Sequence, residues 1–223
     1  MLATASVRFP PGTRIADLPG YAEGAFWVQD AAASMPAALL DARAGERVAD
    51  LCAAPGGKTA QLAAAGASVV AVERDPARLA RLRENLVRLR LSAEIVQADA
   101  ATWSPGELFD AVLLDAPCSA TGTIRRHPDV PYLKRQQDVA ALAATQRTLL
   151  QAAARLLKPG GRLVYAVCSL QPEEGPAHAC PPGLTPTPFA DSDLTQNGQL
   201  RTHPGMWPEV GGMDGFFAAR FVK

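Results

Sequence analysis

Apolar positions along the chain fall into two alternating patterns. Short apolar runs bounded by polar or glycine-containing segments predict strands at residues 47–51, 68–72, 94–97, 111–115, 162–168 and 215–222. Between these runs, apolar residues recur every three or four positions and predict helices at residues 30–40, 58–65, 76–89 and 138–157. Strands that alternate with helices form a parallel sheet with helices on both faces, so we predict an α/β fold.

Two stretches lack either pattern. Residues 1–29 contain turn-forming Pro-Gly pairs and predict an irregular N-terminal segment. Residues 171–208 are rich in Pro, Gly, Thr and Asp and predict a long loop with little regular structure. The remaining pattern predicts one domain, from residue 30 to residue 223.

Composition narrows the class of protein. Hydrophobic residues make up 48% of the 223 residues and charged residues 20%, as in ordinary globular proteins. The chain has no long apolar segment and no basic start followed by an apolar run, so we expect neither a membrane span nor export. A formal net charge of zero argues against strong autonomous binding to nucleic acid, without excluding a local basic strip.

The chain has four cysteines: Cys52, Cys118, Cys168 and Cys180. None forms a CxxC pair and no histidine cluster accompanies them, so we expect no metal site. Four cysteines are also too few for a disulfide framework in a chain of this length, and we therefore expect reduced thiols in a cytosol.

The segment at residues 50–59 follows a predicted strand and opens a predicted helix. Gly56 and Gly57 let the backbone approach a ligand closely, and the helix N-terminus offers free N–H groups. A phosphate-binding P-loop is the competing interpretation, because a Gly-Lys-Thr run resembles the end of that motif. The P-loop needs a glycine at position 52, where this chain has Cys52, and the GxGxxG fingerprint is absent.

Two acids close the second and third predicted strands. Glu73 stands at a distance after the glycine turn that is typical of an acceptor for ribose hydroxyls, and Asp99 is placed to meet an adenine edge. Each acid alone is better explained by solvation of a strand end. The glycine loop, Glu73 and Asp99 together, however, follow the first three predicted strands in order, and this favours a nucleoside cofactor.

Two cysteines follow the fourth and fifth predicted strands. Buried cysteines usually serve as small apolar side chains, and we interpret Cys52 and Cys180 in this way. Cys118 and Cys168 differ because both lie in loops at the functional edge of the predicted sheet. If their strands are neighbours, the two thiols face one pocket beside the cofactor.

Thiols at such an edge suit the methylation of cytosine. Carbon 5 of cytosine is a poor nucleophile, but thiolate attack at carbon 6, with a carboxyl group bonded to ring nitrogen 3, creates an enamine that attacks a methyl donor. The thiolate must form, so its pKa should fall below the free value of about 8.5. Asp115 is the natural carboxyl partner, and the residues alone do not decide which thiol attacks.

Two specific runs carry a family resemblance: Asp-Leu-Cys-Ala-Ala-Pro-Gly-Gly-Lys-Thr at 50–59, and Asp-Ala-Pro-Cys-Ser at 115–119 followed by Gly-Thr-Ile-Arg-Arg at 122–126. With them the chain, from residue 24 to residue 217, resembles the Sun/RsmB family of ribosomal RNA cytosine-5 methyltransferases, which is related to the eukaryotic nucleolar Nop and NSun enzymes. The resemblance implies a Rossmann-like class I methyltransferase fold with a seven-stranded, mostly parallel sheet. It also implies that residues 30–223 are the catalytic domain and that S-adenosylmethionine is the cofactor.

The resemblance further implies roles for single residues. It assigns the nucleophile to Cys168 and product release to Cys118, with Asp115 and Lys58 in the catalytic pocket. The implied cofactor site consists of Cys52, Ala53, Ala54, Pro55, Gly56, Gly57, Lys58, Glu73, Asp99 and Asp115. The residues implied to lie near the RNA are Arg125, Arg126 and His127.

We therefore expect an RNA (cytosine-5-)-methyltransferase in the cytoplasm, acting as a monomer on RNA, with ribosomal RNA as the expected substrate and with no metal or membrane partner. The alternative is a non-catalytic RNA-binding or assembly factor that keeps the fold. Both cysteines, Asp115 and the glycine loop favour the enzyme. A nucleotide hydrolase is disfavoured by Cys52.

Overall fold

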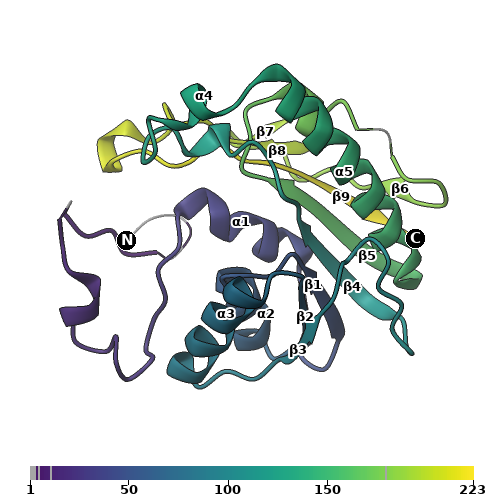
Figure 1. The fold of residues 1–223 in the computed structure, drawn as a ribbon, viewed down its shortest axis with the longest axis horizontal. Helices are drawn as coiled ribbons and strands as arrows, with labels where there is room; N and C mark the ends of the chain where they lie inside the picture. Colours follow the sequence, from purple (N-terminus) through teal and green to yellow (C-terminus); the bar gives the residue numbers. More distant parts are fainter. Residues whose placement is uncertain (1–3, 5, 11, 179) are drawn as a thin grey trace.

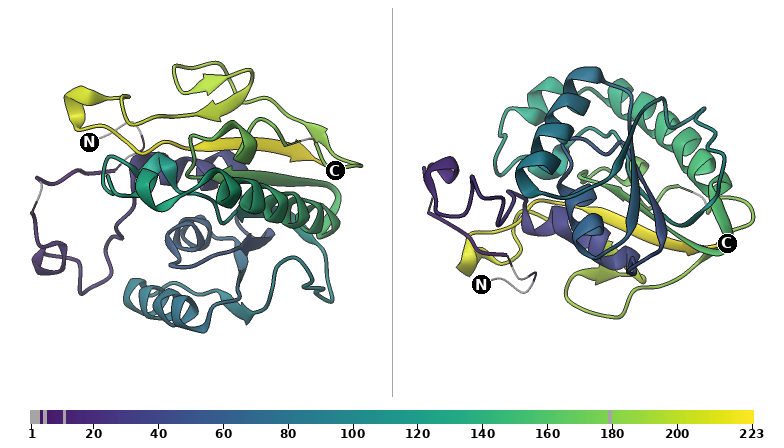
Figure 2. Two further views of the ribbon diagram at one scale, coloured as in Figure 1. Left: turned by 45° about the horizontal axis from the view of Figure 1, so that its top comes forward. Right: turned by 90° about the horizontal axis from the view of Figure 1, so that it is seen from below.

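A computed structural model describes residues 4, 6–10, 12–178 and 180–223. Within the predicted irregular segment 1–29, residues 1–3, 5 and 11 lie outside the described residues. The described part of that segment contains turns and one short 3-10 helix, η1 (Ile15–Asp17). Figure 2 shows this segment (purple) beside the yellow C-terminal loop, to which Arg8 donates two hydrogen bonds.

One mixed sheet forms the centre of the molecule (Figure 1). The strand order is β3-β2-β1-β4-β5-β9-β8-β7, and β6 pairs with β9. Strands β1 to β5 are parallel, whereas β6 to β9 pair in antiparallel fashion. The strands are β1 (Arg47–Leu51), β2 (Ser68–Glu73), β3 (Glu94–Gln97), β4 (Phe109–Asp115), β5 (Leu157–Val167), β6 (Thr185–Pro186), β7 (Thr195–Gln196), β8 (Gln199–Arg201) and β9 (Phe217–Val222).

Helices cover both faces of the sheet, as the alternating pattern predicted. Figure 1 shows α5 on one face and α1, α2 and α3 on the other. The helices are α1 (Ala31–Leu40), α2 (Gly57–Ala64), α3 (Pro76–Leu89), α4 (Val130–Leu133) and α5 (Gln136–Arg155), with 3-10 helices η2 (Thr121–Thr123), η3 (Pro172–Glu174) and η4 (Pro208–Val210). Among the described residues, no helix is both long and apolar enough to cross a membrane.

Local chemistry explains where two of these helices begin. The side chain of Asp30 accepts a hydrogen bond from the backbone N–H of Ala32 and caps α1. Asp75 caps α3 by accepting from two backbone N–H groups, and Pro76 occupies the first helical position, where it loses no hydrogen bond. Such a cap contributes about 1 kcal/mol to helix stability.

The sheet has an apolar core on each face. Along β4, Val112 and Leu114 face α5, whereas Ala111 and Leu113 face α1 and α2. Both sets are fully buried, as expected for a parallel strand covered on both sides. The leucines of α3 pack on Ala71 of β2 and complete the second face.

The fold departs from the prediction after η3. The resemblance implied seven strands, whereas the described residues form nine, because the two-residue strands β6 and β7 join the other seven. Both lie within residues 171–208, which we predicted to be a loop. The β7–β8 hairpin turns at Asn197-Gly198, with φ values of 54° and 73°, and Asn-Gly is the preferred pair for such a turn. Strands this short show no apolar alternation, so the Asn-Gly pair is the signal that our prediction missed.

Register brings the ends of four strands to one level. In the parallel pairs, Leu51 lies opposite both Val72 and Leu114, and Asp115 lies opposite Ala166. The loops after β1, β2, β4 and β5 therefore leave the sheet at one edge. Ligands of open α/β sheets bind at this carboxyl edge, where the strand order reverses, which here is between β1 and β4.

Candidate active site

The two cysteine turns meet at the carboxyl edge. Cys118 follows β4 and Cys168 follows β5, and the two Sγ atoms lie 3.4 Å apart because these strands are neighbours. Gly122, in the turn after Cys118, donates its N–H to the carbonyl of Cys168 at 3.0 Å. A Cβ on Gly122 would lie 1.9 Å from the carbonyl oxygen of Gly215, so only glycine allows the segments to approach this closely.

The surroundings of the two thiols differ in charge. The hydrogen bond to Cys168, then burial, then the charges of Cys168 and Glu174 raise the pKa of Cys118 well above its usual value. On the other side, the charge of Cys168 contributes to raising the pKa of Lys58 and of Arg126, which means that Cys168 lies within reach of both cations. Cys118 is therefore a thiol that its surroundings keep protonated.

Lys58 and Asp115 form an ion pair beside the thiols. Nζ of Lys58, in the first turn of α2, donates to Oδ2 of Asp115 at 2.7 Å and lies 5.2 Å from the centre of the Phe216 ring. Burial acts to lower the pKa of Lys58, but the charge and hydrogen bond of Asp115 raise it overall, so the ammonium form persists. Oδ1 of Asp115 makes no hydrogen bond within the part of the chain that the structure describes.

A second acid on β1 lies behind this pair and had no role in our prediction. Asp50 is fully buried, and its Oδ2 accepts from the Thr59 hydroxyl at 2.6 Å. Burial raises the pKa of Asp50 to about 7, against the lowering effect of the Thr59 hydrogen bond. Its other oxygen, Oδ1, is buried without a hydrogen-bond partner in the described structure.

Glu73 ends β2 with its side chain buried and one oxygen unpartnered. Oε1 accepts from the backbone N–H of Asp75 at 3.0 Å. Oε2 lies 3.3 Å from Nη1 of Arg78, an ion-pair distance without hydrogen-bond geometry, and has no hydrogen-bond partner among the described residues. A buried acceptor of this kind at the carboxyl edge fits the hydroxyl donors of a ribose.

The glycine loop leads from β1 into α2. Gly56 has φ of 101°, and a Cβ there would lie 3.2 Å from Cγ of Leu82, so both the backbone conformation and the packing favour glycine. Burial, followed by the charges of nearby acids, raises the pKa of Cys52 to about 12, which suits a small buried side chain and not a nucleophile. Asp99 is exposed beyond β3, where Oδ1 accepts from the N–H of Ala101.

Glu174 is the main residue of the site that our sequence analysis missed. It ends η3 and is fully buried between the cysteine turns, where it accepts hydrogen bonds from Ser119 and Ser169. A serine directly follows both Cys118 and Cys168 in the sequence, and this repeated Cys-Ser pair was the available signal. No local pattern showed that a distant acid would join the two serines.

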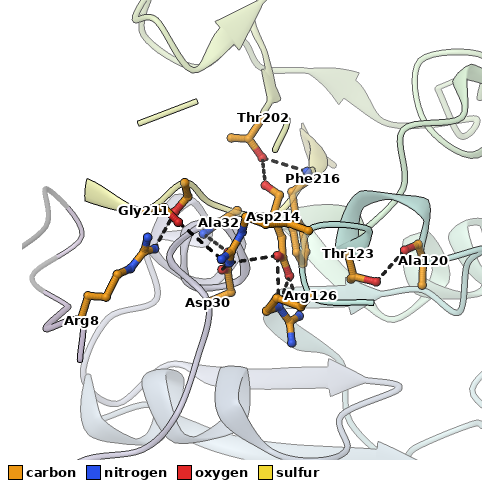
Figure 3. Close-up of polar contacts among 12 residues, drawn as sticks. Arg8, Asp30, Ala32, Ala120, Thr123, Arg126, Thr202, Gly211, Asp214 and Phe216 are labelled. Atoms are coloured by element: carbon orange, nitrogen blue, oxygen red, sulfur yellow. Dashed lines mark hydrogen bonds and ion pairs between the residues drawn. The ribbon is translucent and has the colours of Figure 1, made fainter. Parts of the chain in front are cut away.

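The two arginines predicted to lie near RNA form ion pairs with acids, and Figure 3 shows that of Arg126 with the buried Asp214. Arg126 binds both carboxylate oxygens of Asp214, and Arg125 lies 2.9 Å from Oδ2 of Asp30. Oδ1 of Asp30 accepts from the backbone N–H of Asp214, so the start of α1, the turn after η2 and the chain before β9 are tied together. His127 is exposed beside them.

A cavity of about 420 Å³ lies away from the thiols. It is lined by Leu150, Tyr165, His178, Cys180, Phe221 and their neighbours. None of Cys118, Cys168, Lys58 and Asp115 lines it. In the ranges that the structure describes, no group of three or more His, Cys, Asp and Glu side chains is arranged to hold a metal ion.

Comparison with known sequences points to one family. The model of a family described as 16S rRNA methyltransferase RsmB/F matches residues 37–222. A protein of Erwinia tasmaniensis named ribosomal RNA small subunit methyltransferase B is 47% identical over 225 residues, covering 98% of this chain and 52% of that protein. A protein of the same name from Vibrio cholerae is 48% identical, covering 92% of this chain and 48% of that protein. The chain thus spans about half the length of the curated relatives that it matches.

Solved structures have the same fold. The crystal structure of NSun6 from Pyrococcus horikoshii with SFG is similar with a TM-score of 0.82 and 27% identity, covering 95% of this chain and 56% of that one. A methyltransferase homologue from the same organism is similar with a TM-score of 0.78 and 29% identity, covering 95% of this chain and 72% of that one. The fold is therefore the Rossmann-like class I methyltransferase fold, with two short strands added.

Replacement of Asp214 by Asn should destabilise the protein. The change leaves the guanidinium groups of Arg125 and Arg126 beside an uncharged amide. Because both arginines are partly exposed and Arg125 keeps Asp30, the expected cost is about 1–2 kcal/mol, below that of a fully buried pair. Urea denaturation followed by circular dichroism measures the loss. Asp193→Asn, at an exposed position, is the control, and equal midpoints for both variants would contradict the tying role of Asp214.

The 3.4 Å separation predicts selective cross-linking of the thiols. Diamide, which takes up two electrons and the two thiol protons, should convert Cys118 and Cys168 to a disulfide, because a small side-chain rotation brings the sulfurs to bonding distance. Peptide mapping by mass spectrometry should show Cys52 and Cys180 still as thiols. A disulfide that involves Cys52 or Cys180 in the folded protein would show that the thiols are not paired as described.

Proposed function

Because this chain belongs to the family of 16S rRNA methyltransferases RsmB/F, we propose that it transfers a methyl group from S-adenosylmethionine to carbon 5 of a cytosine in RNA. The observation that carries this proposal is the pair of thiols 3.4 Å apart, next to the Lys58–Asp115 ion pair, at the ligand-binding edge of the sheet. Ribosomal RNA is the proposed substrate, since the matched relatives bear that name, and the cytoplasm is the proposed location.

Cys168 is the nucleophile in this proposal. Its sulfur forms a bond to carbon 6 of the cytosine, and the electrons of the 5,6 double bond make carbon 5 nucleophilic. Lys58 and Arg126 supply positive charge near this position. The Sγ of Cys118 lies 3.4 Å away, where either thiol can donate a hydrogen bond to the other. As carbon 6 is attacked, ring nitrogen 3 takes up a proton from solvent, and this N–H donates to Oδ1 of Asp115, the oxygen that Lys58 leaves available.

Cys118 acts in release. After carbon 5 is methylated, a base takes its proton and the electrons of that C–H bond restore the 5,6 double bond. The bond between carbon 6 and Cys168 breaks at the same time, and its electron pair leaves on the sulfur of Cys168. Cys118 lies in contact with Cys168 and is the nearest group to assist this step. The raised pKa of Cys118 keeps it from competing as the attacking thiolate.

The cofactor residues are those that the resemblance implied. When bound, S-adenosylmethionine supplies the methyl group from its sulfonium centre. Glu73 accepts from its ribose through the unpartnered Oε2, residues 52–58 hold it against the start of α2, and Asp99 meets the adenine. We also propose that the catalytic domain covers residues 30–223 and acts as a monomer.

RNA contact is proposed for the turn at residues 125–127. The side chain of Arg126 remains 46% exposed while it pairs with Asp214, so it can also meet a phosphate. Arg125 is more deeply engaged with Asp30 and serves mainly to hold the turn. His127 is exposed and free to approach the RNA.

Replacement of Glu73 by Ala should weaken cofactor binding. The loss of hydrogen bonds to a charged group predicts a cost of about 1.5–3 kcal/mol, which corresponds to a dissociation constant raised by roughly ten- to hundredfold. Calorimetry with S-adenosylhomocysteine measures it. Glu84→Ala, on the exposed face of α3, is the matched control. An unchanged affinity in Glu73→Ala would show that the ribose lies elsewhere.

The two cysteines should have separable roles. Cys118→Ala should still attack and methylate RNA but remain attached to it, giving a slow-migrating protein–RNA band on denaturing gels. Cys168→Ala and the double variant should give no band, since no attack occurs. A band in Cys168→Ala would reverse the assignment. An unmodified protein with no band and no methyl transfer would favour the non-catalytic RNA-binding factor instead.

A further inference from the structure

A single buried carboxylate connects the two cysteine turns. Oε1 of Glu174 accepts from the backbone N–H of Ser119 at 2.8 Å and from the side-chain amide of Gln146, on α5, at 3.1 Å. Oε2 accepts from the hydroxyls of Ser119 and Ser169, both at 2.5 Å. These serines directly follow Cys118 and Cys168, so the carboxylate bonds to the residue after each thiol.

The bonding around Glu174 is complete. Four donors meet the acceptor capacity of one carboxylate, which has about four lone-pair sites. The hydroxyls of Ser119, Ser169 and Thr121 also lie within 3.2–3.4 Å of one another. The turns after β4 and β5 are therefore held together by side chains beyond the point where the backbone ladder of the sheet ends.

The charge of the carboxylate also acts on Cys118. Glu174 is one of the groups that raise the pKa of Cys118, after the hydrogen bond to Cys168, burial and the charge of Cys168. The carboxylate that joins the two turns therefore also helps to keep Cys118 in the thiol form.

We propose that Glu174 is a positioning residue that holds the two thiols in contact and keeps Cys118 in the thiol form. This inference rests on the proposed function only for the reaction in which the thiols take part. The contact between the thiols and the protonation of Cys118 are measurable without RNA or cofactor.

Glu174→Gln removes the negative charge of Glu174 but can keep its hydrogen bonds to the two cysteine turns. Its amide can accept from the Ser119 N–H and from Gln146 and can donate to the two hydroxyls, which rotate to accept. Glu173→Gln is the matched control because it removes the same charge one residue away. Its hydrogen bond is to Gln136 on α5 and not to a cysteine turn.

The test is alkylation of the folded proteins with iodoacetamide across a range of pH, with each cysteine quantified by peptide mass spectrometry. In the unmodified protein and in Glu173→Gln, Cys118 should be alkylated only at high pH. In Glu174→Gln, alkylation of Cys118 at a fixed pH should become about tenfold faster, because Cys118 loses a neighbouring anion. An unchanged rate for Cys118 in Glu174→Gln would overturn the role of the charge.

Ser119→Ala tests the connection by itself and serves if Glu174→Gln does not fold. It keeps the carboxylate but removes one hydrogen bond between the turns, so Cys118 should still be alkylated only at high pH while diamide joins the thiols several times more slowly. An unchanged rate of disulfide formation would overturn the positioning role. A protein that shows the expected thiol pattern but transfers no methyl group would refute the proposed function and leave this inference standing.

Discussion

Buried carboxylates must find hydrogen-bond donors or cations, and this requirement organises the functional edge of the molecule. Four acids are buried in the described residues: Asp50, Glu73, Glu174 and Asp214. Asp214 is met by two arginines and Glu174 by four neutral donors, so each ties together segments that are distant in the sequence. Without these partners, burial would cost several kcal/mol per acid, and the loops around the sheet would lose the hydrogen bonds and ion pairs that hold them in one arrangement.

The same acids order the charges around the thiols. From β1 towards β5, the edge carries Asp50, then the Lys58–Asp115 pair, then the cysteines, with Glu174 behind Cys118. A lysine between two acids remains an ammonium despite its burial. Burial and its neighbours raise the pKa of Cys118, while the assignment of the nucleophile to Cys168 stays a proposal.

The part of the fold that follows from local patterns was predictable. The strands at residues 47–51 and 94–97 and the helix at 76–89 form where apolar spacing and capping residues place them. The location of the candidate site was predictable, because the residues after the parallel strands β1, β2, β4 and β5 must meet at one edge of the sheet. The RNA role of Arg125 and Arg126 stays a prediction, and their pairing with Asp30 and Asp214 was invisible because the partners lie 88 to 95 positions away. Glu174 was missed for the same reason, since its four donors come from three separate segments.

Two carboxylate oxygens at the edge, Oε2 of Glu73 and Oδ1 of Asp50, are buried without a hydrogen-bond partner among the described residues. Each such atom costs about 1–3 kcal/mol, which folding must offset elsewhere. Asp50 reduces its cost by protonation, since burial raises its pKa to about 7, and its oxygen can then serve as a donor. Glu73 keeps its charge next to the guanidinium of Arg78, 3.3 Å from Oε2, but that oxygen accepts no hydrogen bond in the described structure. The carboxyl edge therefore has buried acceptor capacity that the described residues do not use, and this is the physical reason to place the proposed cofactor there.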